Sequence, residues 1–204
     1  KAIFITGGPG SGKDIIIREA IPSTKIVELN LIQARDYLAD KQKLSEKTTD
    51  YRREAIRNRG PLIINGPADD NEKITYIKEE LEELGYETMM VFVNTTDEAS
   101  KERNSLLNRM MVESIRHDKW VKSQQVARQY EQIYGNFNEF DNTGDLESKE
   151  FDIHEIYQTS RDFLAKTVIN ESADEWLIKN NKLDINYTIN RLFEDKTNDK
   201  TTNR

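Results

Sequence analysis

The stretch that decides the fold is Gly7-Gly8-Pro9-Gly10-Ser11-Gly12-Lys13-Asp14. It follows an apolar run at residues 2–5 and precedes apolar-rich residues 15–20, so a strand, a glycine loop and a helix start stand in the order that a phosphate-binding loop needs. Glycines let backbone N–H groups approach an anion closely, and the helix behind them adds the positive end of its dipole. A lysine at the end of the loop reaches the outer phosphates as a point charge. The predicted nucleotide-binding residues are Gly8, Gly10, Ser11, Gly12, Lys13 and Asp14.

The spacing from Gly7 to Lys13 matches the Walker A pattern, but the next residue departs from it. That position normally holds a Ser or Thr whose hydroxyl binds magnesium, and here it holds Asp14. A carboxylate also suits magnesium, which prefers oxygen ligands, and it suits a helix N-terminus. We therefore predict ATP and Mg²⁺ as cofactors, with Asp14 as a metal ligand. The alternative is a glycine-rich turn that carries a lysine by chance.

The length, charge and residue content of the chain limit the classes of protein to which it can belong. The chain has 204 residues, of which 36% are hydrophobic, so it is long enough for one α/β domain with a sizeable core. The net charge of -7 gives no general attraction for nucleic acid, so such binding would need a local patch. The absence of Cys excludes disulfides and thiolate metal sites and fits a cytoplasmic location. No apolar run approaches the ~20 residues of a membrane span, so we expect no membrane partner.

The start of the chain gives two further expectations. Its apolar run is too short for a signal peptide and continues directly into the glycine loop. The first residue is Lys1 rather than Met, so we expect that the N-terminus has been trimmed or processed.

Apolar runs and turn residues divide the chain into alternating strands and helices. Short apolar runs predict strands at residues 2–6, 25–29, 61–65, 88–93 and 137–142. Helices are predicted at residues 13–20, 31–39, 49–58, 71–84, 97–118, 120–134 and 151–168. This alternation implies an α/β fold with a mostly parallel five-stranded sheet and helices on both faces.

The C-terminal part of the sequence differs from the rest. We place the main domain at residues 1–168 and a helical extension at residues 169–204. The extension contains an amphipathic stretch at residues 176–193, and its last residues carry no large apolar side chain. Such an end cannot bury enough apolar surface to order itself, so we predict a frayed tail.

The pattern resembles the small P-loop kinases, particularly the polynucleotide kinase and zeta-toxin branch of the P-loop NTPases, over residues 1–165. The resemblance rests on the glycine loop, the third strand with its turn, Glu102-Arg103-Asn104 after the fourth strand, and Phe140-Asp141-Asn142-Thr143-Gly144. The Gly12-Lys13-Asp14 variant is similar to that of phage deoxynucleoside monophosphate kinases and animal phosphomevalonate kinases. The resemblance implies a three-layer fold of nucleoside-kinase type.

The resemblance also implies site residues beyond the loop. In such kinases an arginine-bearing lid closes on the transferred phosphate, and Arg103 matches the arginine that follows the fourth strand. Arg109 and Arg116 come six and then seven residues later and are further lid candidates. Guanidinium groups suit phosphoryl charge because they present fixed, bidentate donors. Asn142 and Thr143 match a turn that often lines the adenine pocket. The alternatives are a solvated helix face and a plain turn.

A catalytic base is the least determined part of the site. Kinases of this branch usually place an Asp after the second strand to accept the acceptor's proton, and the matching residue here is Asn30, which cannot act as a base. Glu28 and Asp36 are the two candidates, and another group or none stays open.

The turn after the third strand also departs from the resemblance. Relatives often have Asp-Gly-Thr where this chain has Asn65-Gly66-Pro67, which removes a carboxylate near magnesium. Asp69 and Asp70 follow, and we expect them to cap the helix at residues 71–84 rather than to replace that carboxylate.

Two other nucleotide-binding classes fit less well. A motor ATPase needs an apolar strand that ends in Asp, whereas the third and fourth strands end in Asn65 and Asn94. A dinucleotide-binding dehydrogenase is disfavoured because the loop carries Lys13.

The sequence therefore predicts an ATP-dependent phosphotransferase, a P-loop kinase. Its acceptor would be a hydroxyl or phosphate on a nucleotide, a nucleic acid (including a hydroxymethylated base in phage DNA) or a small molecule. The candidate catalytic residues are Lys13, Arg103, Arg109, Glu28 and Asp36. The competing hypothesis is a non-catalytic nucleotide-binding domain with a structural or regulatory role in an assembly. It is motivated by the departures at Asp14, Asn30, Asn65 and Pro67.

Overall fold

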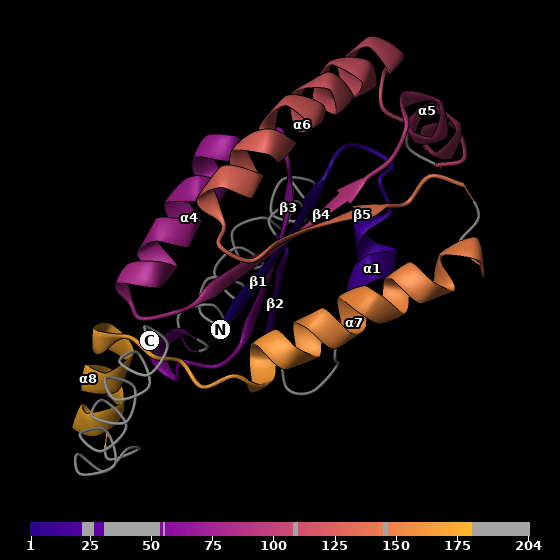
Figure 1. The fold of residues 1–204 in the computed structure, drawn as a ribbon. Helices are drawn as coiled ribbons and strands as arrows, with labels where there is room; N and C mark the ends of the chain where they lie inside the picture. Colours follow the sequence, from indigo (N-terminus) through magenta and orange to yellow (C-terminus); the bar gives the residue numbers. More distant parts are fainter. Residues whose placement is uncertain (22–26, 31–53, 55, 108–109, 145–146, 181–204) are drawn as a thin grey trace, which may run out of the picture.

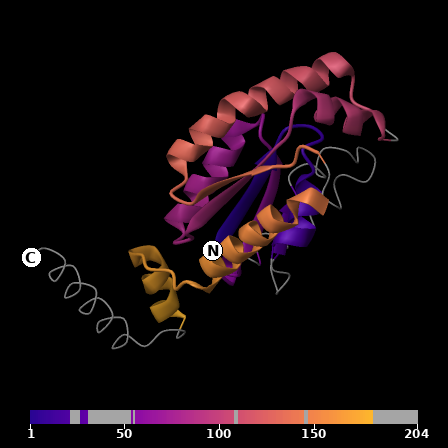
Figure 2. The same ribbon diagram turned by 45° about the vertical axis from the view of Figure 1, so that its right-hand side comes forward.

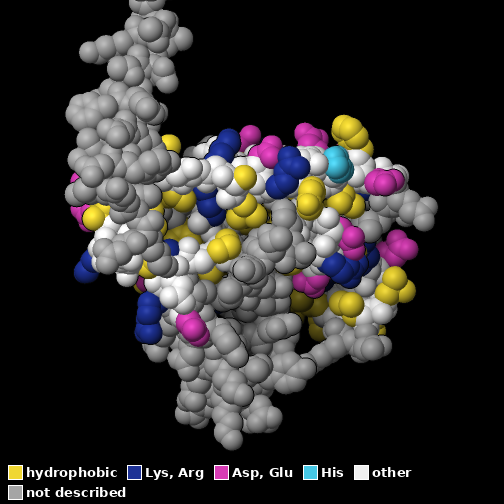
Figure 3. Space-filling model, turned by 90° about the horizontal axis from the view of Figure 1, so that it is seen from below, with side chains coloured by type: hydrophobic (Ala, Val, Ile, Leu, Met, Phe, Trp, Pro, Cys, Tyr) yellow, Lys and Arg dark blue, Asp and Glu magenta, His cyan; other side chains and the backbone are white. Residues whose placement is uncertain are grey.

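The computed structural model describes residues 1–21, 27–30, 54, 56–107, 110–144 and 147–180. Within these residues, strands alternate with helices and form the layered α/β arrangement of Figure 1. None of the helices in this part of the chain is long and apolar enough to cross a membrane. On the face seen in Figure 3, the described Lys and Arg side chains are interspersed with Asp and Glu, without a continuous basic surface.

The sheet is parallel, with the strand order β2-β3-β1-β4-β5. The strands are β1 (Ala2–Gly7), β2 (Val27–Asn30), β3 (Leu62–Pro67), β4 (Thr88–Asn94) and β5 (Phe137–Asp141). This order differs from the 3-2-1-4-5-6 order of the dinucleotide-binding fold. The chain leaves β1 toward one side of the sheet and returns to its other side with β4, so the carboxyl end of β1 is a point where parallel sheets bind ligands.

Helices cover both faces of the sheet, as the two views in Figures 1 and 2 show. On one face, α4 (Asn71–Glu83) and α6 (Glu113–Ile133) bury Ile74, Leu81 and Tyr130 against Phe4 and Phe92. On the other face, α1 (Lys13–Ala20) and α7 (Glu150–Ala165), which follows the short η1 (Glu147–Lys149), bury Ile16, Ile156 and Phe163 against Ile3 and Val91. The buried strands carry apolar side chains on both faces, as expected between two helical layers. The predicted α/β fold with a parallel sheet is confirmed.

The helix predicted at residues 97–118 begins at the expected residue, but its continuity is wrong. The chain forms α5 (Asp97–Ser105) and then breaks, and α6 starts at Glu113 and runs as one helix through the predicted boundary near residue 119. The side chain of Asn104 makes the break: its Nδ2 donates to the Met111 carbonyl at 2.9 Å and its Oδ1 accepts from the Met111 amide at 3.0 Å. These bonds satisfy backbone groups outside a helix, and neither Gly nor Pro marks the position.

The predicted helices at residues 31–39 and 49–58 fall mostly outside the described residues, as does the tail from residue 181. In the C-terminal extension, α8 (Glu171–Lys179) begins before the amphipathic stretch predicted at residues 176–193. Asn170 starts it there, because its side chain accepts a hydrogen bond from the Ala173 amide at 2.9 Å.

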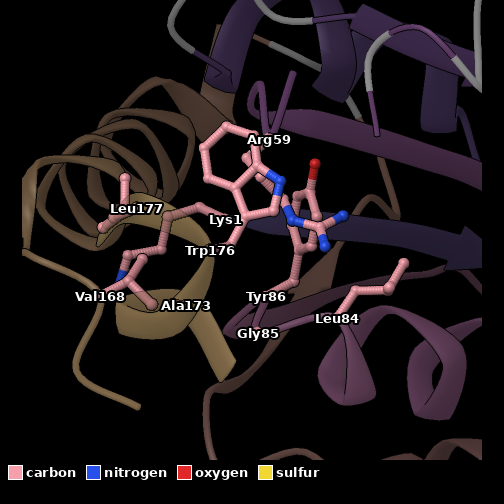
Figure 4. A pocket seen from close by; sticks show the side chains of 9 residues that line it. All are labelled: Lys1, Arg59, Leu84, Gly85, Tyr86, Val168, Ala173, Trp176 and Leu177. Carbon is pink, nitrogen blue, oxygen red and sulfur yellow. The ribbon is translucent and has the colours of Figure 1, made fainter. Parts of the chain in front are cut away.

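Helix α8 packs against the amino edge of the sheet. Asn170 Nδ2 donates to the Gly85 carbonyl at 3.0 Å, and the backbone of Ala173 lies directly over Gly85. Beside this contact is a cavity of about 110 Å³, where Figure 4 shows the Trp176 indole next to the Arg59 guanidinium. The extension is therefore in contact with the sheet, at the end opposite the glycine loop.

The importance of the contact between α8 and Gly85 can be tested by comparing Gly85 with Gly144, a glycine outside this contact that has a similar backbone conformation. Gly85 and Gly144 have φ angles of 87° and 90°. An added Cβ would lie 2.6 Å from the Ala173 nitrogen at Gly85, whereas at Gly144 it would meet no atom of the described residues within 4 Å. We expect Gly144→Ala to cost about 1 kcal/mol of unfolding free energy, and Gly85→Ala about 2–3 kcal/mol with exposure of Trp176. Chemical denaturation and Trp176 fluorescence in a Trp120→Phe background measure both. Equal losses in the two variants would contradict the packing of α8 on Gly85.

Candidate functional site

The glycine loop joins the end of β1 to the start of α1 at the carboxyl edge of the sheet. Gly10 and Gly12 adopt φ angles of 66° and 83°, in the left-handed region that favours glycine. The Ser11 amide donates to the Gly8 carbonyl at 3.3 Å and closes a tight turn. The first N–H groups of α1 follow, and such groups have no partner within their own helix. The predicted strand, loop and helix therefore lie where the sequence places them.

Close packing around the loop requires glycine at several positions. An added Cβ would lie 2.2 Å from the Val93 carbonyl oxygen at Gly7, 2.9 Å from the Ser100 oxygen at Gly10, and 2.3 Å from Asn142 Nδ2 at Gly12. At Gly8 an added Cβ would lie 2.6 Å from Ser123 Oγ of α6. These glycines thus let the ends of β4 and β5 and two helices approach the loop backbone.

Side chains from outside the loop hold three of its consecutive carbonyl groups. Ser100 Oγ donates to the Pro9 oxygen at 2.7 Å, and Arg103 Nη1 donates to the Gly10 oxygen at 3.0 Å. Asn142 Nδ2 donates to the Ser11 oxygen at 2.7 Å. These three carbonyl groups are thus directed toward α5 and β5, so the N–H groups of the same peptide units point to the opposite side of the loop.

Lys13 occupies the first position of α1 and folds back over the loop. Its Nζ donates to the Gly7 and Gly8 oxygens at 3.1 Å and 3.4 Å. Burial lowers the pKa of Lys13 to about 8, and the nearby carboxylates of Asp14 and Asp69 only partly oppose this shift. The loop thus holds a cation that lacks full solvation, which an anion at the loop would stabilise.

The one carboxylate in the first turn of α1, Asp14, fits a magnesium ion that is bound together with phosphate groups. Asp14 lies in the first turn of α1, is exposed, and accepts a hydrogen bond from Asn65 Nδ2 at 3.2 Å. The described residues contain no group of three or more side chains that could hold a metal ion. Magnesium is commonly bound by one or two carboxylates, phosphate oxygens and water, so Asp14 fits a metal that arrives with phosphates.

Asp69 does not cap α4 as expected, and Lys119, which no sequence pattern marks, is its partner. Asp70 takes the N-cap position of α4 without a capping side-chain hydrogen bond, whereas Asp69 forms an ion pair with Lys119 of α6. The same carboxylate is close enough to Lys13 to affect its pKa. Asp69 thus lies between two cations near the loop. The pair joins residues 50 positions apart, and no motif in the sequence marks it.

The arginines predicted for a lid have different environments. Arg103 is half-buried, and besides the Gly10 carbonyl it donates to the Asn142 oxygen at 2.6 Å. Arg116 is fully buried, and it donates to Asp97 at 2.5 Å and to Glu113 at 2.9 Å. These hydrogen bonds raise the pKa of Arg116, so it is a structural cation and not a free lid residue. Arg109 lies outside the described residues.

The turn after β5 lies beside the loop, where the adenine pocket was predicted. Asn142 is buried, and its Nδ2 bond to Ser11 makes it part of the loop's packing. Thr143 is at least partly exposed, and its Oγ1 accepts from the Thr96 amide at 3.1 Å. The half-buried side chains of Thr143 and Arg103 form the rim of this turn that is available to a ligand.

The two candidates for the catalytic base stay predictions. Glu28 lies within β2, where it pairs with Ile63 of β3, but only its backbone is described. Asp36 lies outside the described residues.

No protein-family model matches the sequence, and no curated protein matches it significantly. Among solved structures, a gluconokinase from Sinorhizobium meliloti 1021 is similar with 16% identity and a TM-score of 0.48, over 80% of this chain and 91% of the other. An uncharacterized protein from Eubacterium ventriosum ATCC 27560 is similar with 12% identity and a TM-score of 0.45, over 81% of this chain and 99% of the other. Neither similarity is close enough to assign a family or an activity.

Proposed function

We propose that the chain binds ATP with Mg²⁺ at the glycine loop and transfers the γ-phosphate to an acceptor hydroxyl or phosphate. The observation that carries the proposal is the loop itself: left-handed glycines, carbonyl groups held outward, a helix start and a desolvated Lys13. Together these supply N–H donors and positive charge, which is what phosphate groups require. The acceptor would be a nucleotide, a nucleic acid or a small molecule.

Each residue near the loop has a proposed role in this reaction. The backbone of residues 8–14 and the Lys13 ammonium bind the phosphates, and Asp14 contributes an oxygen ligand to magnesium. The metal supplies charge neutralisation on the transferred phosphate. Asp69 lies near enough to Lys13 to affect its pKa, and Lys119, which forms an ion pair with Asp69, would be a second cation beside the same site. Arg103, Arg109, Glu28 and Asp36 keep their predicted catalytic roles as proposals.

A second candidate function is a nucleotide-binding domain without catalysis. The observation that favours it is the arginine environment: the hydrogen bonds of Arg103 go to the protein itself, and Arg116 is buried between two carboxylates. Both guanidinium groups thus already have protein partners. This candidate shares the ATP site and differs only in the absence of turnover.

Acceptor-dependent turnover separates the two candidates. The experiment measures ADP release with Mg²⁺ for a panel of nucleosides, nucleotides and DNA with a 5′-hydroxyl or a hydroxymethylated base. Release that depends on one acceptor class supports the phosphotransferase and identifies its substrate. ATP binding without turnover on any acceptor favours the non-catalytic domain.

The pKa of Lys13 predicts how ATP affinity depends on pH. Bound phosphate favours the charged ammonium, so the pKa rises above about 8 in the complex. ATP affinity therefore has its highest value at about pH 7, and it falls by up to about tenfold per pH unit above about pH 8. Calorimetric titrations across this range measure the effect, and Lys13→Arg, whose charge persists, is the control. A pH-independent affinity in the wild type would place Lys13 away from the phosphates.

A further inference from the structure

We propose that Ser100 is a positioning residue for the phosphate loop and that Arg116 holds it in its working orientation. The inference rests on the proposed ATP site, because it concerns which backbone donors of the loop meet the phosphates. It assigns a role in ligand binding to two buried residues of α5 and α6.

The bond from Arg116 fixes the direction in which the Ser100 hydroxyl donates its hydrogen. A serine hydroxyl has one hydrogen to donate and also accepts, whereas a guanidinium group only donates. Arg116 Nη1 donates to Ser100 Oγ at 2.7 Å, so the single hydrogen of Ser100 is left for the Pro9 carbonyl, also at 2.7 Å. Both residues are completely buried, so no water competes for these bonds.

The bond from Ser100 in turn orients the peptide unit between Pro9 and Gly10. A trans peptide is planar, and its C=O and N–H point in opposite directions. The described residues contain no cis peptide bond. Because Ser100 binds the Pro9 oxygen on the α5 side, the Gly10 N–H is directed to the other side of the loop. There it is available to a phosphate oxygen.

Two carboxylates hold the Arg116 guanidinium in place. Its other nitrogens bind Asp97 Oδ1 at 2.5 Å and Glu113 Oε2 at 2.9 Å, which brings carboxylates from α5 and α6 to one guanidinium. The pKa of Glu113 is lowered by this hydrogen bond, so its carboxylate is charged at neutral pH. His117 also contacts Asp97, at 3.0 Å. The guanidinium therefore has a fixed position from which it orients Ser100.

A neighbouring peptide provides an internal reference. Asn142 holds the Ser11 oxygen at 2.7 Å, which by the same geometry directs the Gly12 N–H away from β5. Among the hydrogen bonds of the described residues, the Ser100 hydroxyl bonds with Pro9 and Arg116 and not with this peptide. Loss of Ser100 should thus affect Gly10 while Gly12 keeps its orientation.

The test compares Ser100→Ala with Ser105→Ala, a serine of the same helix whose hydroxyl also donates to a carbonyl but away from the loop. The readouts are ATP affinity by calorimetry and the amide ¹H–¹⁵N shifts of Gly10 and Gly12 on addition of ATP. In the wild type and Ser105→Ala we expect both amides to shift. In Ser100→Ala we expect about tenfold weaker binding, a lost Gly10 response and a retained Gly12 response.

Several results would overturn the inference. One is a wild-type Gly10 response in Ser100→Ala, and another is an equal loss at Gly10 and Gly12, which would indicate general loosening of the loop. Arg116→Met, which removes the donor behind Ser100, should reduce the Gly10 response in the same selective way. If the wild type binds no ATP, the proposed function fails and this inference with it. If the wild type binds ATP and Ser100→Ala leaves affinity unchanged, only the inference fails.

Discussion

Replacement of Lys13 by Met is expected to weaken ATP binding by about 100-fold and to abolish turnover, while making the ligand-free protein more stable. The loss of affinity follows from removal of a charge-assisted contact to phosphate, which contributes about 1.5–3 kcal/mol. The gain in stability follows from burial: lowering the pKa from 10.5 to about 8 corresponds to a cost of about 3 kcal/mol at neutral pH. Part of this gain is offset by the lost bonds to the Gly7 and Gly8 carbonyls. Calorimetric ATP titration and chemical denaturation measure the two effects.

The lowered pKa of Lys13 also predicts how the stability of the folded wild type changes with pH. Between about pH 8 and about pH 10.5 the unfolded chain binds a proton on Lys13 that the folded chain does not, so the wild type gains stability as pH rises there. Lys13→Met lacks this gain. Lys122→Met, a change at an exposed lysine of α6, is the matched control and should alter neither quantity. Unchanged ATP affinity in Lys13→Met would be incompatible with a phosphate-binding role.

Asp14→Asn is expected to affect ATP binding in opposite directions with and without magnesium. Asn keeps the size of the side chain but loses the charge, so the Mg²⁺ concentration for half-maximal binding or turnover should rise about 10- to 100-fold. Without metal, the carboxylate repels phosphate, so ATP should bind the variant about threefold more tightly or better. Titrations of ATP with Mg²⁺ and with a chelator measure both values.

The control for Asp14 is Asp152→Asn, because Asp152 also lies in the first turn of a helix, α7. It loses the same favourable interaction with a helix dipole, about 0.5 kcal/mol, without altering the loop. If Asp14→Asn weakens ATP binding equally with and without Mg²⁺, Asp14 acts on the loop's structure and is not a metal ligand.

The sequence predicted the parts of the fold that depend on local pattern. The glycine loop, the buried strands and the helix from Asn71 follow from glycine spacing, apolar runs and helical periodicity, and these signals are contained within a few residues. The same reasoning located the turn at Asn142, because its Asn-Thr-Gly sequence ends a strand.

The errors concern contacts between distant residues. The break between α5 and α6 depends on the two bonds of Asn104 with Met111, which no turn residue announces. Spacing made Arg116 a lid candidate, with a solvated helix face as the alternative, whereas the structure buries its side chain, which donates to Asp97, 19 positions away. The Lys119–Asp69 pair likewise forms only when α6 lies across the β3–α4 turn. Such contacts depend on how helices pack on the sheet, which periodicity does not specify.

The glycine loop is the proposed recognition site for the phosphates of a nucleotide. The most direct test is calorimetric titration of the wild-type chain with ATP, ADP and adenosine in the presence of Mg²⁺. The structure predicts binding of ATP and ADP and at least about 100-fold weaker binding of adenosine, because the loop N–H groups and Lys13 meet only phosphate. Equal affinity for all three, or binding of none, would contradict it.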